Sequence, residues 1–310
     1  MLSRVADSIF WMSRYMERSN SMLRLVRTHY IASQDDLKEF NWNALMDAYH
    51  IARESSDNQF SSLSEMLHFL IIDKRNIDSV FNNVTLAREN ARAVQDHITK
   101  EVWQALNDYY HLMRDPSIHQ QILSGDPVTA MDAFLKQSML FYGMVDNTMG
   151  RGEGFNFLNI GKYLERSVQT IQMLHFKVNS GYDPLAVTDS AEWRYFLFSV
   201  SAYELYLKTY RGSVQPNLAV QLTVHNDHFP HSIIYCLQQI HRYFDRLQPD
   251  SLEEHHQQLN FLIGKATTMV RYDSFSGKTK EQLTQSLRLL FAELVGIAQA
   301  FNKFYFGFNS

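Results

Sequence analysis

Phe10-Trp11-Met12-Ser13-Arg14-Tyr15-Met16-Glu17-Arg18-Ser19 is echoed 148 residues later by Leu158-Asn159-Ile160-Gly161-Lys162-Tyr163-Leu164-Glu165-Arg166-Ser167. Tyr, Glu, Arg and Ser hold the same places in both stretches, and Lys162 preserves the charge of Arg14. Neither stretch contains proline, and their apolar residues do not alternate as in a half-buried strand. The pair therefore predicts two copies of one helix.

Two further matches keep nearly the same offset. Trp42-Asn43-Ala44-Leu45 aligns with Trp193-Arg194-Tyr195-Phe196, and Asn76-Ile77-Asp78-Ser79-Val80 aligns with Phe229-Pro230-His231-Ser232-Ile233. Three matches in the same order, with an offset that drifts slowly, indicate an internal repeat. We expect two pseudo-symmetric halves, at about 1–145 and 146–310, that pack as one domain over 1–310.

Helical signals dominate the whole chain. No proline occurs before Pro116, which permits long helices, and apolar residues of the first segment recur every three to four positions from Leu2 to Val26. The sequence predicts an all-α multi-helix bundle. The helices are expected at 2–32, 40–54, 60–72, 78–97, 99–114, 128–148, 155–179, 189–210, 214–224, 230–247, 251–272 and 279–305. Asp115-Pro116 and the stretch from Ser124 to Pro127 are read as loops.

Composition narrows the function classes. The 310 residues carry a net charge of -4, which argues against nucleic-acid binding through a basic surface. The single cysteine, Cys236, excludes intrachain disulfides and fits a reducing compartment. The N-terminus lacks a signal-peptide pattern, and no apolar run approaches the roughly 20 residues that cross a bilayer. A cytoplasmic protein that binds neither membrane nor nucleic acid is expected.

The repeated motif supplies the first candidate site. Residues three and four apart are neighbours on a helix, so the glutamate of each motif lies beside basic residues. One interpretation is a site for an anionic or peptide-like ligand, and the other is an ion-pair network that locks helices together. The candidate residues of the motif are Arg14, Glu17, Arg18, Lys162, Glu165 and Arg166.

A second candidate cluster lies between residues 86 and 94, where Glu89, Asn90 and Arg92 occur among small and aliphatic residues. The density of polar groups beside small residues favours close helix contact through a polar network. The alternative is a solvated helix face with ion pairs between Glu89 and its arginine neighbours. Both interpretations stay open at this level.

Metal and cofactor motifs fail on context. Glu65–His68 and Glu253–His256 both read Glu-x-x-His, which together with Glu17 and Glu165 would suit a di-iron bundle. The repeat offset does not relate one Glu-x-x-His to the other, so we expect no metal site. The histidines at 225, 228 and 231 are read as a polar loop that leads into a helix.

Catalytic and phosphate-binding motifs are missing as well. Gly150-Arg151-Gly152-Glu153-Gly154 is not preceded by a strand and is read as the joint between the halves, where Arg151 could reach an anion. No Gly-x-Ser-x-Gly elbow occurs. The sequence therefore predicts no cofactor and identifies no catalytic residue.

Four blocks together resemble a known family. The blocks are Leu2-Ser3-Arg4-Val5-Ala6 with Phe10 to Arg18, Ala87 to Arg92 with Trp103 to Asn107, Phe157 to Arg166, and Phe229-Pro230-His231-Ser232. They resemble the signatures of the bacterial alpha-E proteins, a domain of unknown function, over essentially the whole chain. Lys162, His231 and Ser13 depart from the Arg, Arg and Gly that are usual there.

The resemblance implies an all-helical protein encoded near a circularly permuted ATP-grasp protein, a transglutaminase-like protein and sometimes an Ntn-hydrolase homologue. The implied role is in forming, modifying or trimming amide bonds. We expect an accessory protein that binds a peptide-like or carboxylate substrate, or the ligase. Two alternatives are an enzyme with Glu17 or Glu165 as general base and a purely structural interaction module.

Overall fold

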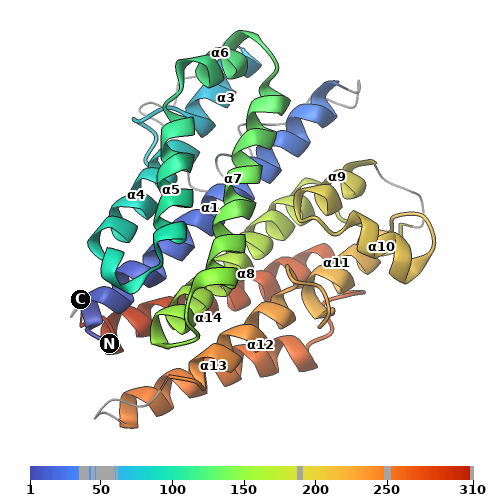
Figure 1. Ribbon diagram of the computed structural model, residues 1–310. Coiled ribbons are helices and arrows are strands. Elements are labelled where there is room, and N and C mark those ends of the chain that lie inside the picture. The colour runs from blue at the N-terminus through green and yellow to red at the C-terminus, as the bar shows by residue number, and fades with distance from the viewer. Residues whose placement is uncertain are drawn as a thin grey trace. The chain divides into compact units, whose positions relative to one another are not determined.

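The computed structural model describes residues 1–34, 42, 46, 60, 62–186, 191–247 and 253–307. Every regular element in these ranges is a helix (Figure 1), which confirms the predicted all-α class. The chain divides into two compact units. We call Ser8–Leu158 the N-terminal unit, and Met1–Asp7 together with Asn159–Ser310 the C-terminal unit.

The N-terminal unit is built on long helices that lie side by side. α4 packs on α5, α5 packs on α7, and the short helix α3 packs on α6. Two polar pairs, Glu17 with Tyr142 and Arg27 with Asp132, place α7 antiparallel to α1. The helices are α1 (Ser3–Gln34, which starts in the other unit), α3 (Leu63–Ile71), α4 (Val80–Ala93), a 3-10 turn (Gln95–His97), α5 (Lys100–Met113), α6 (Pro116–Ser124), α7 (Pro127–Thr148) and the start of α8 (Glu153–Gly181).

The C-terminal unit has a similar order of packing. α11 packs on α12, α12 on α13 and α13 on α14. Asn179, near the end of α8, meets the first turns of α14 through Lys280 and Thr284. The helices are the rest of α8, then α9 (Ala191–Ser199), α10 (Tyr203–Tyr210), α11 (Pro216–His225), α12 (Ile233–Phe244), α13 (Glu253–Tyr272) and α14 (Lys280–Phe304).

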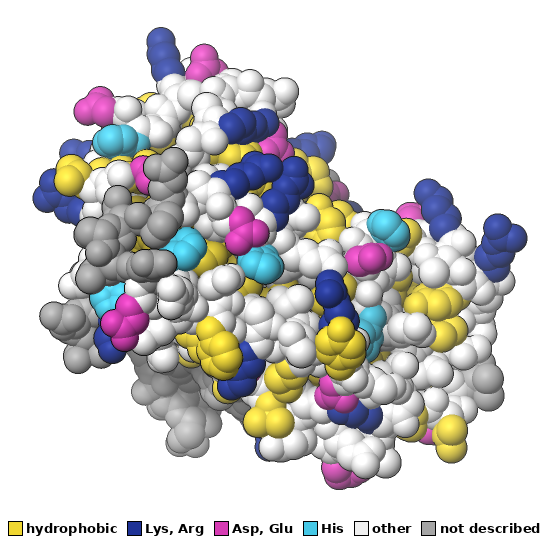
Figure 2. Space-filling model, turned by 90° about the horizontal axis from the view of Figure 1, so that it is seen from below, with side chains coloured by type: hydrophobic (Ala, Val, Ile, Leu, Met, Phe, Trp, Pro, Cys, Tyr) yellow, Lys and Arg dark blue, Asp and Glu magenta, His cyan; other side chains and the backbone are white. Residues whose placement is uncertain are grey.

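Most of these helices bury one apolar stripe rather than their whole circumference. In α12, for example, Ile233, Leu237, Ile240 and Phe244 are buried, at three-to-four spacing. No helix in the described ranges is long and apolar enough to cross a membrane. The exposed apolar side chains on the face shown in Figure 2 lie in small groups among polar ones.

One helix was not predicted. The prediction of a loop at Asp115-Pro116 is wrong, because α6 starts there. The Asp115 side chain accepts a hydrogen bond from the Ser117 backbone, and Pro116 occupies the first helical position, where its missing N–H costs nothing. Asp126 and Pro127 start α7 in the same way. Both Asp-Pro pairs therefore mark helix starts.

The predicted continuous helix over 189–210 is also wrong, because it is interrupted between α9 and α10. Ser201 adopts a left-handed conformation with φ of 57°. The Ala202 N–H donates to the Leu197 carbonyl (2.7 Å) and the Ser201 N–H to the Phe198 carbonyl (3.0 Å). This pair of backbone hydrogen bonds is typical of a helix end, although glycine is the usual residue at the left-handed position. Because serine rarely adopts this conformation, the sequence did not indicate that a helix ends at Ser201.

The helix predicted over 40–54 falls largely outside the described residues. Trp42 and Met46 are the described residues of this range, and both are helical. The second repeat match uses residues 42–45 of this segment. Three of them, 43–45, lie outside the described ranges, so that match stays a prediction. Trp193, which the sequence aligns with Trp42, is buried in α9.

Two helix starts share one local geometry. Ser79 precedes α4 and Ser232 precedes α12, and each side chain caps its helix by accepting a backbone hydrogen bond three residues on. Each serine N–H also closes a turn, to the carbonyl of Asn76 (3.0 Å) or of Phe229 (2.9 Å). The third repeat match thus corresponds to two equivalent turn-and-cap structures.

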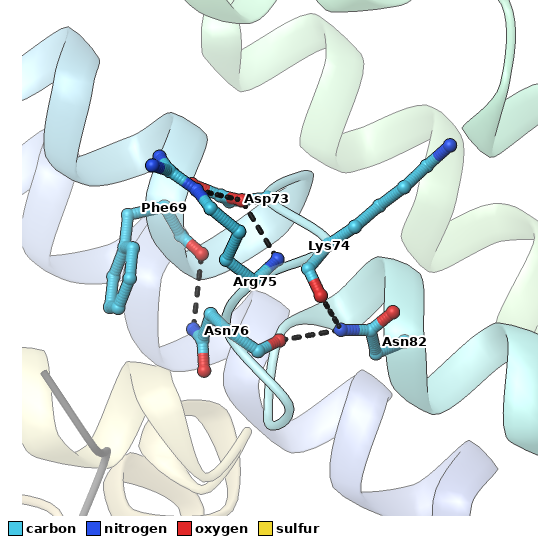
Figure 3. Close-up of polar contacts among 6 residues, drawn as sticks. All are labelled: Phe69, Asp73, Lys74, Arg75, Asn76 and Asn82. Carbon is cyan, nitrogen blue, oxygen red and sulfur yellow. Dashed lines mark hydrogen bonds and ion pairs between the residues drawn. The ribbon is translucent and has the colours of Figure 1, made fainter. Parts of the chain in front are cut away.

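The turn before α4 is held by a set of polar contacts (Figure 3). Asp73 is buried and accepts hydrogen bonds from the Arg75 backbone N–H (2.9 Å) and from its Nη2 (2.7 Å). The Asn76 side chain donates to the Phe69 carbonyl (3.0 Å), and the Asn82 side chain donates to two carbonyls of the turn. The hydrogen bonds from Arg75 hold the pKa of Asp73 below its ordinary value of 3.8.

We expect Asp73→Asn to lower the free energy of unfolding at pH 7 by about 1 kcal/mol, because the buried carboxylate loses a charge-assisted hydrogen bond to the largely exposed Arg75 side chain. The pKa of Asp73 is lower in the folded than in the unfolded chain, so its ionised form stabilises the fold above pH 3.8. That contribution disappears as the pH falls below this value. Urea unfolding at pH 7 and at pH 3 should show the difference between variant and wild type shrinking in acid. Asp108→Asn, at an exposed position of α5, is the control and should change little at either pH.

Candidate functional site

The first motif lies on α1 and is largely buried. Glu17 has 0% exposure and accepts a hydrogen bond of 2.8 Å from the hydroxyl of Tyr142 on α7. The Arg14 guanidinium is buried and lies 4.4 Å from the centre of the Trp11 ring, as in a cation–π contact. Arg18 is half-buried, 5.7 Å from the ring of Tyr15. In this motif the Glu17 carboxylate is therefore buried, whereas Arg18 stays partly exposed to solvent.

The second motif lies on α8 and follows the same division. Glu165 also has 0% exposure, and it accepts a hydrogen bond of 3.0 Å from Gln169, one turn along the same helix. Lys162 is buried with its ammonium 4.6 Å from the Tyr163 ring. Arg166 is half-buried and donates to the Pro230 carbonyl (3.3 Å).

The two glutamates are held differently. Glu17 bonds to a tyrosine from another helix, whereas Glu165 bonds to a glutamine of its own helix. In both cases the carboxylate is inaccessible to solvent in this conformation. A general base must come within hydrogen-bond reach of a substrate proton. The half-buried arginines, by contrast, keep part of their surface accessible.

Tyrosines of α12 surround the second motif. The Tyr163 ring lies 5.9 Å from that of Tyr235 and stacks at 6.2 Å on that of Tyr243, while the Arg166 guanidinium lies 5.3 Å from Tyr163. Burial raises the pKa of the Tyr163 hydroxyl well above its ordinary value, so it stays neutral. Tyr235 and Tyr243 were not among the predicted site residues, although their eight-residue spacing places both on one face of a helix.

The second predicted cluster lies on the outer face of α4. Glu89 and Arg92 are exposed and form an ion pair of 3.5 Å, and Glu89 also pairs with Arg88 at 2.9 Å. The Asn90 side chain donates to the Leu86 carbonyl of its own helix (2.9 Å). These contacts have the character of a solvated helix face, where such pairs contribute little stability.

Arg88, which was not among the candidates, joins α4 to α5. Its Nε donates to the Asn107 side chain (2.9 Å), and its guanidinium lies 5.3 Å from the Trp103 ring and 4.6 Å from the Tyr110 ring. Trp103, Asn107 and Tyr110 follow helical spacing and so share one face of α5. That spacing is the signal that would have pointed to Arg88.

The remaining loops have ordinary structural contacts. Arg151 lies with its guanidinium 4.1 Å from the Phe155 ring and donates to the Asp146 carbonyl (2.6 Å), which spans the joint between α7 and α8. His225 contacts the Asp273 carbonyl through Nε2 (3.0 Å). In the part of the chain that the structure describes, no three His, Cys, Asp or Glu side chains are grouped to hold a metal ion.

Comparison with known proteins gives one family. The model of the Alpha-E family, a predicted alpha-helical domain with a conserved ER motif, matches residues 1–306. In this chain the Glu-Arg dipeptide occurs at 17–18 and 165–166, within the two motif helices.

Relatives with curated sequences are distant. Uncharacterized proteins of Mycobacterium bovis and of two strains of Mycobacterium tuberculosis are each 23% identical to the chain over 257 residues. The match covers 76% of this chain but only 29% of each relative, so the chain spans less than a third of their length. No solved structure matches the chain. With its family model matched over nearly its full length and both Glu-Arg motifs placed on helices, the chain belongs to the Alpha-E family.

Proposed function

We propose that the chain is an accessory protein of an ATP-grasp-linked system that forms or modifies amide bonds. In this proposal Arg18 in the N-terminal unit and Arg166 in the C-terminal unit each provide a separate contact to a carboxylate-bearing, peptide-like substrate or to the ligase itself. The observation that carries it is the division within both motifs, where the glutamate is sealed and the terminal arginine stays half-buried. A guanidinium of this kind suits a carboxylate, which it can bind through two parallel hydrogen bonds.

The geometry supports an accessory role over the enzyme alternative. An enzyme that uses Glu17 or Glu165 as general base needs that carboxylate to face substrate, and both have 0% exposure. The mycobacterial relatives add a second support, because the matched segment there is joined to a much longer polypeptide. A transglutaminase-like protein is a further candidate partner in the same system.

We also propose that the chain arose by duplication of one helical half and folds as a single domain. Three features support the duplication. The caps at Ser79 and Ser232 have the same geometry, and the packing order α4–α5–α7 in one unit resembles the order α12–α13–α14 in the other. The third feature is the helix on which the last helix of each half packs. The first turns of α7 contact the motif helix α1 near Arg27, and the first turns of α14 contact the motif helix α8 near Asn179. One cooperative thermal transition is expected, and two separate transitions would contradict the single domain.

The functional proposal is tested with the ATP-grasp-like protein of the same organism. We expect the two proteins to co-purify and the chain to increase amide formation, followed by mass spectrometry of the product. The double variant Arg18→Gln/Arg166→Gln should lower the affinity for the ligase or for the substrate at least tenfold, because both half-buried guanidiniums are lost. Arg92→Gln is the matched control, since it removes an exposed arginine outside the motifs.

Three outcomes separate the hypotheses. Equal ligation without the chain, together with no complex, would contradict the accessory role. A double variant that lowers the melting temperature while complex and product are unchanged would favour the structural module. Activity of the isolated chain that is lost in Glu17→Gln, with folding intact, would favour the enzyme.

A further inference from the structure

A pocket of about 790 Å³ opens between α13 and α14 of the C-terminal unit. This volume lies within the range of sites that hold small ligands. None of its lining residues belongs to the Arg/Lys-Tyr-x-Glu-Arg motifs. The lining residues are Glu254, Gln257, Gln258, Phe261, Leu262, Gln299, Ala300, Asn302, Lys303 and Phe304.

The two walls of the pocket are antiparallel helices. The ring of His255, at the start of α13, stacks 4.5 Å from that of Phe304, at the end of α14. Ten residues further along α13, Lys265 forms an ion pair of 2.7 Å with Glu293 of α14. Contacts at both places join the two helices that form the walls of the pocket.

Side-chain amides supply neutral polar groups to a pocket whose surface is mainly apolar. Gln258, Gln299 and Asn302 have no hydrogen bond from their side chains to another described residue, and the Asn302 Oδ1 is buried without a partner. An amide side chain offers both donors and an acceptor, which is the set that a peptide backbone needs. A peptide N–H in the pocket would donate to the buried Asn302 Oδ1, and the exposed amides of Gln258 and Gln299 would exchange water for peptide backbone groups.

An apolar surface lies beside these amides. Phe261 is 69% exposed although it is aromatic, and Leu262 and Phe304 line the same pocket. A ligand with an apolar side chain would cover this surface and remove it from water. The combination of amides and an exposed phenyl ring distinguishes the pocket from a purely polar surface groove.

Two opposite charges lie at one end of the pocket. Glu254 is exposed near the start of α13 and has no ion-pair partner among the described residues, while the Lys303 ammonium lies 5.5 Å from the Phe304 ring near the end of α14. Each charge sits at the helix end whose dipole favours it. A peptide that runs along the pocket brings one of its termini to this end, where Glu254 complements a terminal ammonium and Lys303 a terminal carboxylate.

We propose that the pocket between α13 and α14 binds a short peptide with an apolar side chain and free termini. The amides pair with its backbone, Phe261 covers its apolar side chain, and either Glu254 or Lys303 pairs with the terminus that reaches their end of the pocket. This binding site is separate from the motif arginines and does not depend on a ligase. It would stand if the accessory role proved wrong.

Isothermal titration of the full chain with the tripeptide Gly-Leu-Gly tests the site. We expect saturable binding that weakens about fivefold or more in Phe261→Ala and in Gln299→Leu, the first by loss of apolar contact and the second by loss of an amide. The same tripeptide acetylated and amidated at its ends should also bind more weakly. Leu289→Ala is the matched control, because this residue is half exposed on α14 but outside the pocket.

The substituted positions Phe261 and Gln299 are exposed, so the variants should keep the wild-type melting temperature. No saturable binding to the wild type would overturn the proposal. Equal affinities of Phe261→Ala and Leu289→Ala would overturn it as well. Sedimentation that shows a concentration-dependent dimer, lost in Phe261→Ala and unaffected by the tripeptide, would assign the pocket to a second copy of the chain instead.

Discussion

Replacing Glu17 by alanine is expected to lower the free energy of unfolding by about 3–5 kcal/mol, because truncating a fully buried side chain leaves a cavity and a hydroxyl without its acceptor. Glu17 is fully buried on α1, and its carboxylate accepts the hydroxyl of Tyr142. Without it, a cavity forms and the Tyr142 hydroxyl loses its acceptor. Urea unfolding followed by circular dichroism measures the change.

Graded substitutions separate the contributions of this site. Glu17→Gln keeps the volume and an acceptor for Tyr142 but loses the charge, so we expect a smaller loss of about 1.5–3 kcal/mol. Tyr142→Phe removes a single hydrogen-bond donor and should cost about 1 kcal/mol. Glu89→Ala is the control, since its carboxylate is on the exposed face of α4. If Glu17→Ala destabilised the protein no more than Glu89→Ala, a structural role for the motif glutamate would be ruled out.

Replacing Phe244 by alanine should have an effect of similar size, a loss of about 3–5 kcal/mol, as for other large core residues. Phe244 ends α12 with 0% exposure, and its ring stacks 4.4 Å from that of His256. The rings of Phe301 and Tyr305 lie 5.9 and 6.3 Å away. The substitution removes the ring around which α12, α13 and α14 meet.

Phe261→Ala is a matched control for this prediction, because it removes the same side chain from an exposed position of α13. We expect it to change the free energy of unfolding by less than about 0.5 kcal/mol, as for surface substitutions in general. The comparison is made by thermal and urea unfolding of the three proteins under one condition. Equal stability of the two variants would show that the aromatic cluster does not hold these helices together.

The family and the helical class were readable from local patterns. Three-to-four spacing of apolar residues predicts helices, because that spacing puts them on one face whatever the rest of the chain does. The Glu-Arg pairs at 17–18 and 165–166 were visible as a repeat, and they correspond to the motif that describes the family. Ser79 and Ser232 were matched by sequence and have the same capping geometry.

The predicted helices were wrong where a short sequence is compatible with two backbone conformations. Asp-Pro is typical of turns and also of helix starts, and α6 used it as a start. Ser201 ended α9 in a left-handed conformation that serine seldom adopts. At α6 the capping by Asp115 and the position of Pro116 favour the helix start, and at Ser201 two backbone hydrogen bonds hold the left-handed residue that ends α9.

The Arg/Lys-Tyr-x-Glu-Arg motif shows where sequence alone stopped. Its charges were evident from the sequence, but their burial was not, because accessibility depends on which distant helix covers each side chain. Only the tertiary structure brought Tyr142 to Glu17, set Tyr235 and Tyr243 against Tyr163, and paired Arg88 with Asn107. The sequence by itself determined the helices, through the short-range periodicity of apolar residues, and it showed the repeated motif, through matches about 150 residues apart. The tertiary structure decided partners, burial and the pocket of α13 and α14, since these arise from contacts between residues far apart in the chain.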